Sequence, residues 1–393
     1  MQNRSPLYYT LIVSIGGFLF GFDASVISGA IVYLDILFEL SSLSKGWIVS
    51  APAFSAMFAM LGGGVLSDRI GRKKTLQIVA FCYVLSAFLS AVSQDIGSLV
   101  AARMLGGMAF GGALIIVPVY ISEISPAEQR GRLVSIQQMN IVVGFLAAYF
   151  SNYFIGVYLD QWVSELNIWR WMLAVELIPA MVYVTLLPHI PESPMWLKSH
   201  VGQTGKIDSE EAEAPSFLAG RSVYASFVNW LMYQKKHVSL LWSPRWRQIF
   251  LVAMFLGVLQ QITGINSVFF YAPMIFEQSG IGTDASFVQA ILVGVVNLVF
   301  TLIAIALIDR LGRKPLLIFG VSGVALCMFL LSYGFSDATY TLNEDSIVGL
   351  PEEVDQAALT PLLGVTYESD IEYKDALYAA LSLETAQKYE SEL

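Results

Sequence analysis

The chain has 393 residues, of which 56% are hydrophobic and only 13% are charged, whereas about a quarter of the residues in a typical soluble protein are charged. This composition excludes an ordinary soluble domain and indicates that lipid is the main solvent of the chain. The net charge of −9 does not indicate a basic partner, because the segment 336–393 alone holds 13 acidic and 2 basic residues.

Nine segments are each apolar over about the 20 residues that a helix needs to cross a hydrocarbon core of roughly 30 Å. In chain order they are Tyr9–Leu34, Trp47–Leu66, Thr75–Val92, Ile96–Ile121, Leu133–Leu159, Ile168–Ile190, Ile249–Phe276, Phe287–Ile308 and Leu316–Phe335. The first is too long for a signal peptide and is followed by eight more, so we interpret it as a true span. No strand-like alternation competes with these helices, and the pattern predicts an all-α membrane protein.

Basic residues are concentrated in alternate loops between the spans. Most lysines and arginines lie in the loops after the second, fourth, sixth and eighth spans, whereas the other loops and the tail are acidic. Because positively charged loops stay on the cytoplasmic side, we predict a cytoplasmic N-terminus and an external acidic tail. We therefore expect a multi-pass protein of the plasma (inner) membrane.

Two of the basic loops share one sequence pattern, Asp-Arg-x-Gly-Arg-Lys. The pattern includes Asp68, Arg69 and Arg72 in the first loop and Asp309, Arg310 and Arg313 in the second. Each copy lies between two long apolar segments. The repetition predicts two homologous halves with equivalent loops on the same side of the membrane.

The chain is predicted to have four parts: a six-helix bundle (1–192), a cytoplasmic linker with short helices (193–246), the first three helices of a second bundle (247–335) and an acidic extracellular segment (336–393). Residues Ser222–Lys236 have the spacing of a short amphipathic surface helix, and the tail contains two segments typical of short helices. The second bundle has three spans where the first has six. We therefore expect the chain to be part of a longer protein and the nine spans not to function alone.

Only a few residues within the spans are ionisable, and three stand out: Asp23, Arg103 and Glu176. At 1.5 Å per helical residue, all three lie at a depth of roughly 10 Å from the outer face, so they can form one cluster. Ionisable residues at such depths are costly in lipid and are functional by default. The alternative is a static ion pair that holds helices together.

The seventh span contains an amide-rich stretch with Gln260, Gln261 and Asn266. Amides donate and accept hydrogen bonds, which suits neutral hydroxyl groups. Since six residues advance an ideal helix by about 600°, Gln260 and Asn266 converge on one ligand only if the helix bends, and Gly264 and Pro273 provide for such a bend. The alternative is that the amides join helix to helix.

Further amides and aromatic residues complete a candidate polyol pocket, in which polar groups orient the ligand and aromatic faces pack on its C–H surface. The amides are Gln138 on the fifth span and Gln289 and Asn297 on the eighth, and the aromatic residues are Phe22, Phe269, Phe270 and Tyr271. Each amide alone is a weak signal.

Five motifs in this order resemble the sugar porter family of the major facilitator superfamily. They are GGFLFGFDASVISGA, the duplicated DRxGRK loops, ARMLGG with PVYISEISPAEQRG, WRWM with PESPMWL, and QQITGIN with FYAP. The resemblance runs from about Leu11 to Phe335. It implies a major facilitator fold, with a complete six-helix N-terminal bundle and three helices of the C-terminal bundle, that moves a sugar by alternating access.

The resemblance also implies roles for individual residues. Sugar contacts are implied for Gln138, Gln260, Gln261, Asn266 and, less directly, Asn297. The Asp23 and Arg103 positions are similar to the pair linked to proton coupling in bacterial sugar/proton symporters, whereas facilitative glucose carriers have Asn at the Asp23 position. A cytoplasmic charge network that closes the inside is implied for Glu123, Arg130 and Glu192 together with the two DRxGRK loops.

The sequence departs from the family pattern at several positions. Met195 replaces the arginine of the PESPRWL motif, which removes one partner from the cytoplasmic network. Phe270 stands where the family often has Tyr, and Phe145 stands where xylose symporters have Gln. These changes predict a more apolar pocket with an altered sugar preference. The family's last three spans, with a pocket tryptophan and a gate on the tenth, are not in the chain.

We therefore expect a secondary transporter, not an enzyme, that imports a neutral monosaccharide or polyol by proton symport. Two alternatives stay open: an uncoupled facilitative sugar carrier, in which the Asp23–Arg103 pair is structural, and a non-transporting sugar sensor. The expected partners are a small sugar, a proton and the lipid bilayer. We expect no cofactor, metal or nucleic acid, and we expect a monomer.

Overall fold

The structure is a computed structural model. It describes residues 5–38, 40–159, 165–201, 244–278, 283–336, 339–342, 354, 356–367 and 370–381. The amphipathic helix predicted at Ser222–Lys236 lies outside the described residues.

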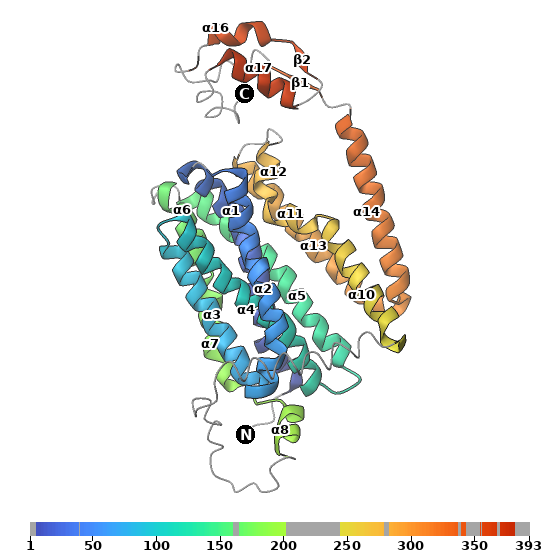
Figure 1. Ribbon diagram of the computed structural model, residues 1–393. Helices are drawn as coiled ribbons and strands as arrows, with labels where there is room; N and C mark the ends of the chain where they lie inside the picture. The colour runs from blue at the N-terminus through green and yellow to red at the C-terminus, as the bar shows by residue number, and fades with distance from the viewer. Residues whose placement is uncertain are drawn as a thin grey trace.

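The N-terminal part consists of long helices joined by short loops (Figure 1). In chain order these are α1 (Pro6–Phe38), α2 (Ser42–Ile70), α3 (Arg72–Val92), α4 (Ile96–Ile124), α5 (Arg130–Phe154), α6 (Glu165–Ala174), α7 (Leu177–Leu186) and α8 (Pro194–Val201). A π-helical turn at Ile155–Leu159 extends α5, and a 3₁₀ turn at Leu187–His189 extends α7.

The second part begins with α10 (Pro244–Ile262), α11 (Ile265–Phe270), α12 (Ala272–Gln278), α13 (Thr283–Leu311) and α14 (Arg313–Ser336). Within the described ranges, nine segments are helical, long and apolar enough to cross a membrane. They coincide with the nine predicted spans. The all-α membrane class is therefore confirmed.

The backbones of α1 and α5 approach closely, because glycines face one another across the contact. A Cβ at Gly21 of α1 would overlap the carbonyl oxygen of Ile141, and a Cβ at Gly144 of α5 would overlap that of Phe18. In membranes, helices associate through such close packing of small residues, since lipid supplies no hydrophobic force between them. This packing makes α1 the centre of the N-terminal part, in contact with α4, α5, α6 and α7.

Two spans are broken in the middle. The sixth span divides into α6 and α7 at Val175 and Glu176. The break lies one turn before Pro179, because proline has no backbone N–H to donate to the preceding turn. The seventh divides at Gly264, which has a left-handed φ of 74°, and again at Tyr271, just before Pro273. The bend predicted for the seventh span is thus confirmed.

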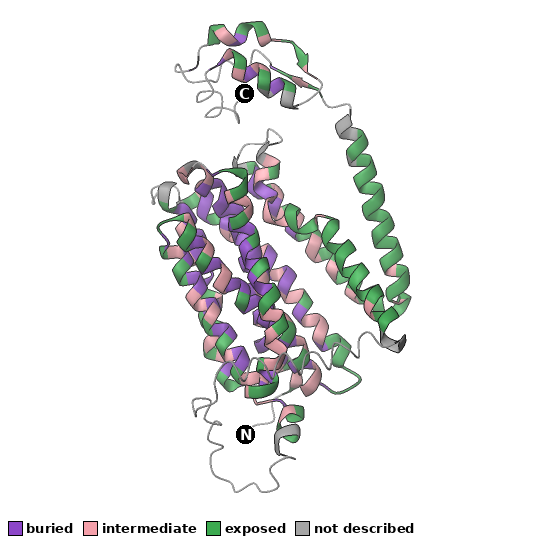
Figure 2. Cartoon of the chain, viewed as in Figure 1, coloured by how far each residue is buried: buried purple, intermediate pink, exposed green. Residues whose placement is uncertain are grey.

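Burial differs strongly between the two parts (Figure 2). Of the most apolar window of the first span, 78% is buried, whereas none of the window in Arg313–Leu330 is. The helices α10 and α14 thus present apolar side chains on nearly all sides. The most extensive contacts between the two parts are made by α13 against α5 and by α11 and α12 against α1.

The tail forms a small unit with its own core. It contains β1 (Tyr340–Thr341), α16 (Gln356–Leu359), a 3₁₀ turn (Thr360–Leu362), β2 (Thr366–Tyr367) and α17 (Asp370–Ala380). The two strands pair antiparallel, with Tyr340 opposite Tyr367. The predicted short helices are present, but the strand pair was not predicted, because two residues are too few to show alternation.

Candidate functional site

Asp23 of α1 and Arg103 of α4 lie together in the interior of the N-terminal helices. They are 3% and 2% exposed, and Arg103 Nη1 lies 3.4 Å from Asp23 Oδ1. Glu176, at the break between α6 and α7, is 4% exposed and interacts electrostatically with both. The structure thus brings together the three ionisable residues that the sequence predicted to cluster.

Arg103 is held by more than the carboxylate. Its Nε donates to the carbonyl oxygen of Ile48 at 3.2 Å, and its Nη2 donates to the carbonyl oxygen of Asp23 at 3.3 Å. These two bonds are to backbone oxygens, so they do not depend on the ionisation of Asp23. The second carboxyl oxygen, Asp23 Oδ2, is buried and has no hydrogen-bond partner among the described residues.

Tyr83 of α3 interacts with this cluster, and both Tyr83 and Tyr183 of α7 bond to α1. Tyr83 is fully buried and interacts electrostatically with Asp23 and Glu176. Its hydroxyl donates to the carbonyl oxygen of Gly16 at 3.1 Å, and that of Tyr183 donates to Val13 at 3.3 Å. The hydroxyls therefore tie α3 and α7 to the part of α1 that precedes Asp23.

The predicted amides of the seventh span lie at its break. Asn266 Nδ2 of α11 donates to Gln261 Oε1 of α10 at 2.8 Å, across the turn at Gly264. Gln260 and Gln261 are exposed. The break thus brings Gln261 and Asn266 together, whereas the side chain of Gln260 makes no hydrogen bond in the described part of the chain.

The other predicted amides lie on helices that contact each other. Gln138 of α5 is exposed, and Asn297 and Gln289 of α13 are half-buried. Phe145 follows Gln138 by seven residues and so lies on the same face of α5. Its ring packs on that of Phe269 of α11 at 5.1 Å between centroids. Gln138 therefore belongs to the face of α5 that is directed at α11.

The aromatic residues on α1 are arranged differently from the prediction. Phe20 packs against Phe145 at 6.4 Å, on the side of α11. Phe22 is buried, stacks on Phe18 and lines a pocket of about 440 Å³ between α1, α5 and α7. Two residues rotate a helix by about 200°, so Phe22 points away from the face that Phe20 occupies. Sequence reasoning missed Phe20, although its helical spacing to Ala24 of the same cluster could have indicated it.

Two further predicted aromatic residues lie on the seventh span. Phe270 is half-buried against the cluster that contains Phe145. Tyr271, at the second break, donates its hydroxyl to the carbonyl oxygen of Lys45 at 3.3 Å, which joins this span to α2.

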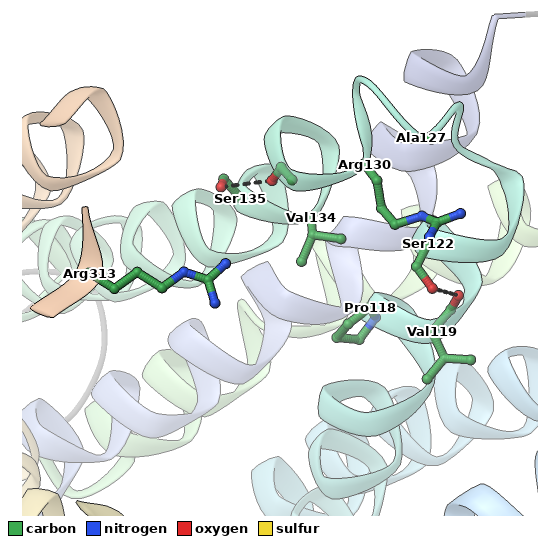
Figure 3. Close-up of a pocket in the computed structure, with 9 residues that line it drawn as sticks. Pro118, Val119, Ser122, Ala127, Arg130, Val134, Ser135 and Arg313 are labelled. Carbon is green, nitrogen blue, oxygen red and sulfur yellow. Dashed lines mark hydrogen bonds between the residues drawn. The ribbon is translucent and has the colours of Figure 1, made fainter. Parts of the chain in front are cut away.

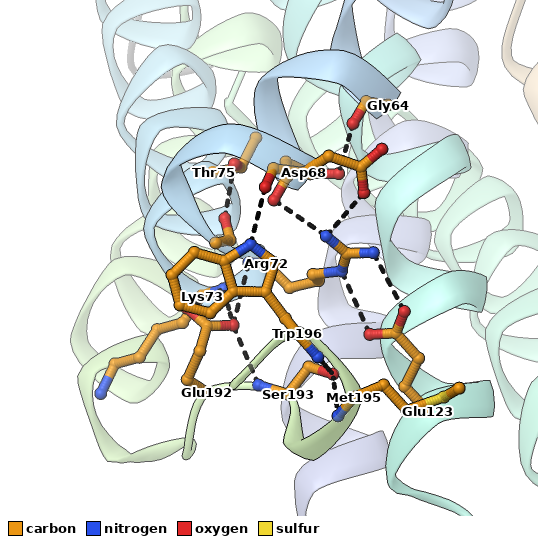
Figure 4. Close-up of polar contacts among 12 residues, drawn as sticks. Gly64, Asp68, Arg72, Lys73, Thr75, Glu123, Glu192, Ser193, Met195 and Trp196 are labelled. Carbon is orange, nitrogen blue, oxygen red and sulfur yellow. Dashed lines mark hydrogen bonds and ion pairs between the residues drawn. The ribbon is translucent and has the colours of Figure 1, made fainter. Parts of the chain in front are cut away.

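A polar network lies at the opposite end of the N-terminal helices, around Arg72 (Figure 4). The guanidinium binds Glu123 of α4 with two bonds, Nε to Oε2 at 3.1 Å and Nη2 to Oε1 at 3.0 Å. Nη1 lies 2.7 Å from Asp68 Oδ1 and donates to the carbonyl oxygen of Ser67 at 3.0 Å. Arg72 thereby fastens the end of α2 to the end of α4.

Glu192 belongs to the same network, but it contacts backbone rather than a guanidinium (Figure 4). Its Oε1 accepts from the backbone N–H groups of Arg72 at 2.9 Å, Lys73 at 3.0 Å and Ser193 at 2.9 Å. The N–H groups of Arg72 and Lys73 are free donors at the start of α3, where negative charge is favoured. Met195, in the place of the family's arginine, is exposed.

The remaining predicted network residues make no ion pair among the described residues. These are Arg69, Arg130, Arg310 and Arg313, and the side chain of Asp309 is outside the described part. Arg130 of α5 and Arg313 of α14 instead line a pocket of about 680 Å³ with Ser122 and Ser135 (Figure 3). Within the described ranges, no group of His, Cys, Asp or Glu is arranged to hold a metal ion.

Comparison with known proteins identifies the chain. The model of the sugar (and other) transporter family matches residues 9–349. The chain belongs to this family. It is therefore a membrane transporter and not an enzyme, and the resemblance derived from its motifs is confirmed.

Individual relatives agree with this assignment. The arabinose-proton symporter of Bacillus subtilis is 35% identical over 325 residues, which are 82% of this chain and 69% of that protein. The D-xylose-proton symporter of Escherichia coli K12 is 34% identical over 85% of this chain and 73% of its own. A solved structure of the xylose transporter XylE from E. coli, in a partially occluded inward-open conformation, superposes with a TM-score of 0.67, covering 84% of this chain and 77% of that chain.

Proposed function

We propose that the protein imports a neutral monosaccharide or polyol together with protons, by alternating access of its two groups of helices. The observation that carries this proposal is the buried Asp23–Arg103 pair, in which one carboxyl oxygen has no partner among the described residues. A buried polar atom without a partner is costly, and a proton on Oδ2 would relieve the charge. The names of the two symporters above support the same coupling.

The sugar would bind between α5, the break of the seventh span and α13. Gln138, Gln261, Asn266 and Asn297 would hydrogen-bond its hydroxyls, and Phe20 and Phe145 would pack on its apolar face. The basic loops would lie on the cytoplasmic side of a bacterial inner membrane, as the positive-inside rule requires. The Arg72 network would then hold the inner end of the N-terminal helices closed.

The test is uptake by the full-length protein in liposomes, with and without an inward proton gradient. The wild type should accumulate sugar only with the gradient. Asp23→Asn keeps the size of the side chain but removes its titration, so it should abolish accumulation and retain exchange between equal concentrations. Asp95→Asn is the matched control, because Asp95 caps α4 at an exposed position and Asn caps equally well.

If the wild type gains nothing from the gradient, the Asp23–Arg103 pair is structural and the protein is an uncoupled carrier. Accumulation by Asp23→Asn would lead to the same conclusion. Binding without any uptake would instead support the sensor.

A further inference from the structure

Asp23 Oδ2 faces a position of α4 that is occupied by a glycine, Gly106, and therefore has no side chain. Gly106 follows Arg103 by three residues, so it lies on the same face of α4. A Cβ at Gly106 would lie 3.6 Å from Asp23 Oδ2 and 2.6 Å from the hydroxyl oxygen of Ser86. The carboxyl group and the hydroxyl therefore border the same small space, which only glycine leaves open.

The Ser86 hydroxyl is oriented as an acceptor toward this space. Its Oγ donates its hydrogen to the carbonyl oxygen of Ala102 at 2.8 Å. A serine hydroxyl has one hydrogen and two acceptor positions, so the oxygen remains able to accept. Ser86 itself is 3% exposed, and water does not compete freely for that position.

We propose that Ser86 positions the transported proton by accepting the hydrogen that Asp23 Oδ2 carries when Asp23 is protonated. This inference rests on the proposed proton symport. On loading, a proton from the outer medium forms an O–H bond at Oδ2, and on release that bond breaks toward the inner side. No other bond changes, and no other reactant is required.

The groups around Asp23 fit this assignment. Arg103 of α4 binds Oδ1, Glu176 lies at the break between α6 and α7, and Tyr83 reaches in from α3. From α5, the Tyr149 hydroxyl donates to the carbonyl oxygen of Phe269, and α2 contributes the Ile48 carbonyl. None of these groups, and not Ser86 either, is hydrogen-bonded to Oδ2 in the described part of the chain. Ser86 is distinguished because its hydroxyl oxygen and Oδ2 both lie against the Cβ position of Gly106.

The experiment compares two serines that make equivalent bonds. Ser55 is buried on α2, and its hydroxyl donates to the carbonyl oxygen of Met104 at 2.7 Å, as Ser86 does to Ala102. Gradient-driven uptake is measured against external pH for the wild type, Ser86→Ala and Ser55→Ala. Ser86→Ala removes the acceptor of the protonated form, so its half-maximal pH should shift downward by about 0.5–1 unit. Ser55→Ala should keep the wild-type midpoint.

Gly106→Ala provides an independent variant, because its Cβ would displace the Ser86 hydroxyl and should shift the midpoint in the same direction. Exchange at equal sugar concentrations checks that each variant is folded. The inference is overturned if Ser86→Ala and Gly106→Ala keep the wild-type midpoint, or if Ser55→Ala shifts as much. Absence of any gradient effect in the wild type would refute the proposed function itself, which is a different result.

Discussion

The contact between Asp23 and Arg103 is long for an ion pair. Charge-assisted N–H···O bonds are usually about 2.7–2.9 Å, whereas Nη1 and Oδ1 are 3.4 Å apart. Arg103 is held in addition by two backbone carbonyls, so its position does not require a charged Asp23. A residue pair arranged in this way can lose the charge of its acid without losing the fold, which is what a proton carrier needs.

At the residue scale, Gln261 tests the candidate sugar site. Gln261→Ala should leave a desolvated sugar hydroxyl without its partner, at a cost of about 1–3 kcal/mol. The dissociation constant should rise roughly five- to a hundredfold, as measured by titration of the purified protein with sugar. Leu256→Ala on the same helix, at a comparably exposed position, is the control. Equal effects of the two substitutions would mean that the amides are structural.

At the scale of elements, the two DRxGRK loops share one backbone feature, a glycine with positive φ between two helices. Each joins two helices through a single glycine with positive φ, 98° at Gly71 and 82° at Gly312. The surroundings differ, because a Cβ at Gly71 would overlap the Glu192 carboxylate, whereas a Cβ at Gly312 meets nothing within 4 Å. In the first loop both the positive φ and the neighbouring Glu192 side chain therefore require glycine. In the second loop only the positive φ does.

This difference predicts unequal effects of two equivalent substitutions. Alanine in the left-handed region costs roughly 1–2 kcal/mol, so Gly312→Ala should lower the melting temperature modestly. Gly71→Ala should lower it clearly more, since it also displaces Glu192 from the start of α3. Thermal unfolding in detergent measures both. Equal shifts would show that the Glu192 contacts add nothing to the loop.

At the scale of the whole molecule, the described N-terminal helices carry two clusters of charge, the buried Asp23 cluster and the partly buried Arg72 network. The Asp23 cluster joins α1 to α4, and the Arg72 network joins α2, α3 and α4. Removing one residue of a largely buried ion pair leaves the charge of the other residue without a counter-charge. The two clusters therefore differ in what they permit, because Asp23 can be neutralised by a proton, whereas Arg72 keeps its charge at every relevant pH.

Arg72→Ala should accordingly destabilise the protein by roughly 2–4 kcal/mol, since Glu123 would be left without its bidentate partner. Arg69→Ala is the matched control, because Arg69 lies three residues before Arg72 in the same motif, is exposed and makes no ion pair among the described residues. It should change stability by less than about 0.5 kcal/mol. Thermal unfolding of the two variants gives the comparison. A small effect of Arg72→Ala would contradict the network.

The sequence alone determined the membrane class, the nine spans and the duplicated loops. These features depend on local properties: length of apolar segments, positions of charge and the repeated pattern around Gly71 and Gly312. The cluster of Asp23, Arg103 and Glu176 was also predictable, because depth follows from counting residues along a helix. The bend at Gly264 followed in the same way from the conformational freedom of glycine.

Only the tertiary structure decided which atoms meet. It selected Phe20 rather than Phe22 for the cluster with Phe145, because the rotation of α1 is set by the glycine contacts with α5. It gave Glu192 backbone partners instead of a guanidinium. It also placed the Ser86 hydroxyl and Asp23 Oδ2 against the same position of α4, at Gly106, although the two residues are 63 positions apart in the sequence. Such contacts depend on the packing of helices distant along the chain, which periodicity within one helix does not contain.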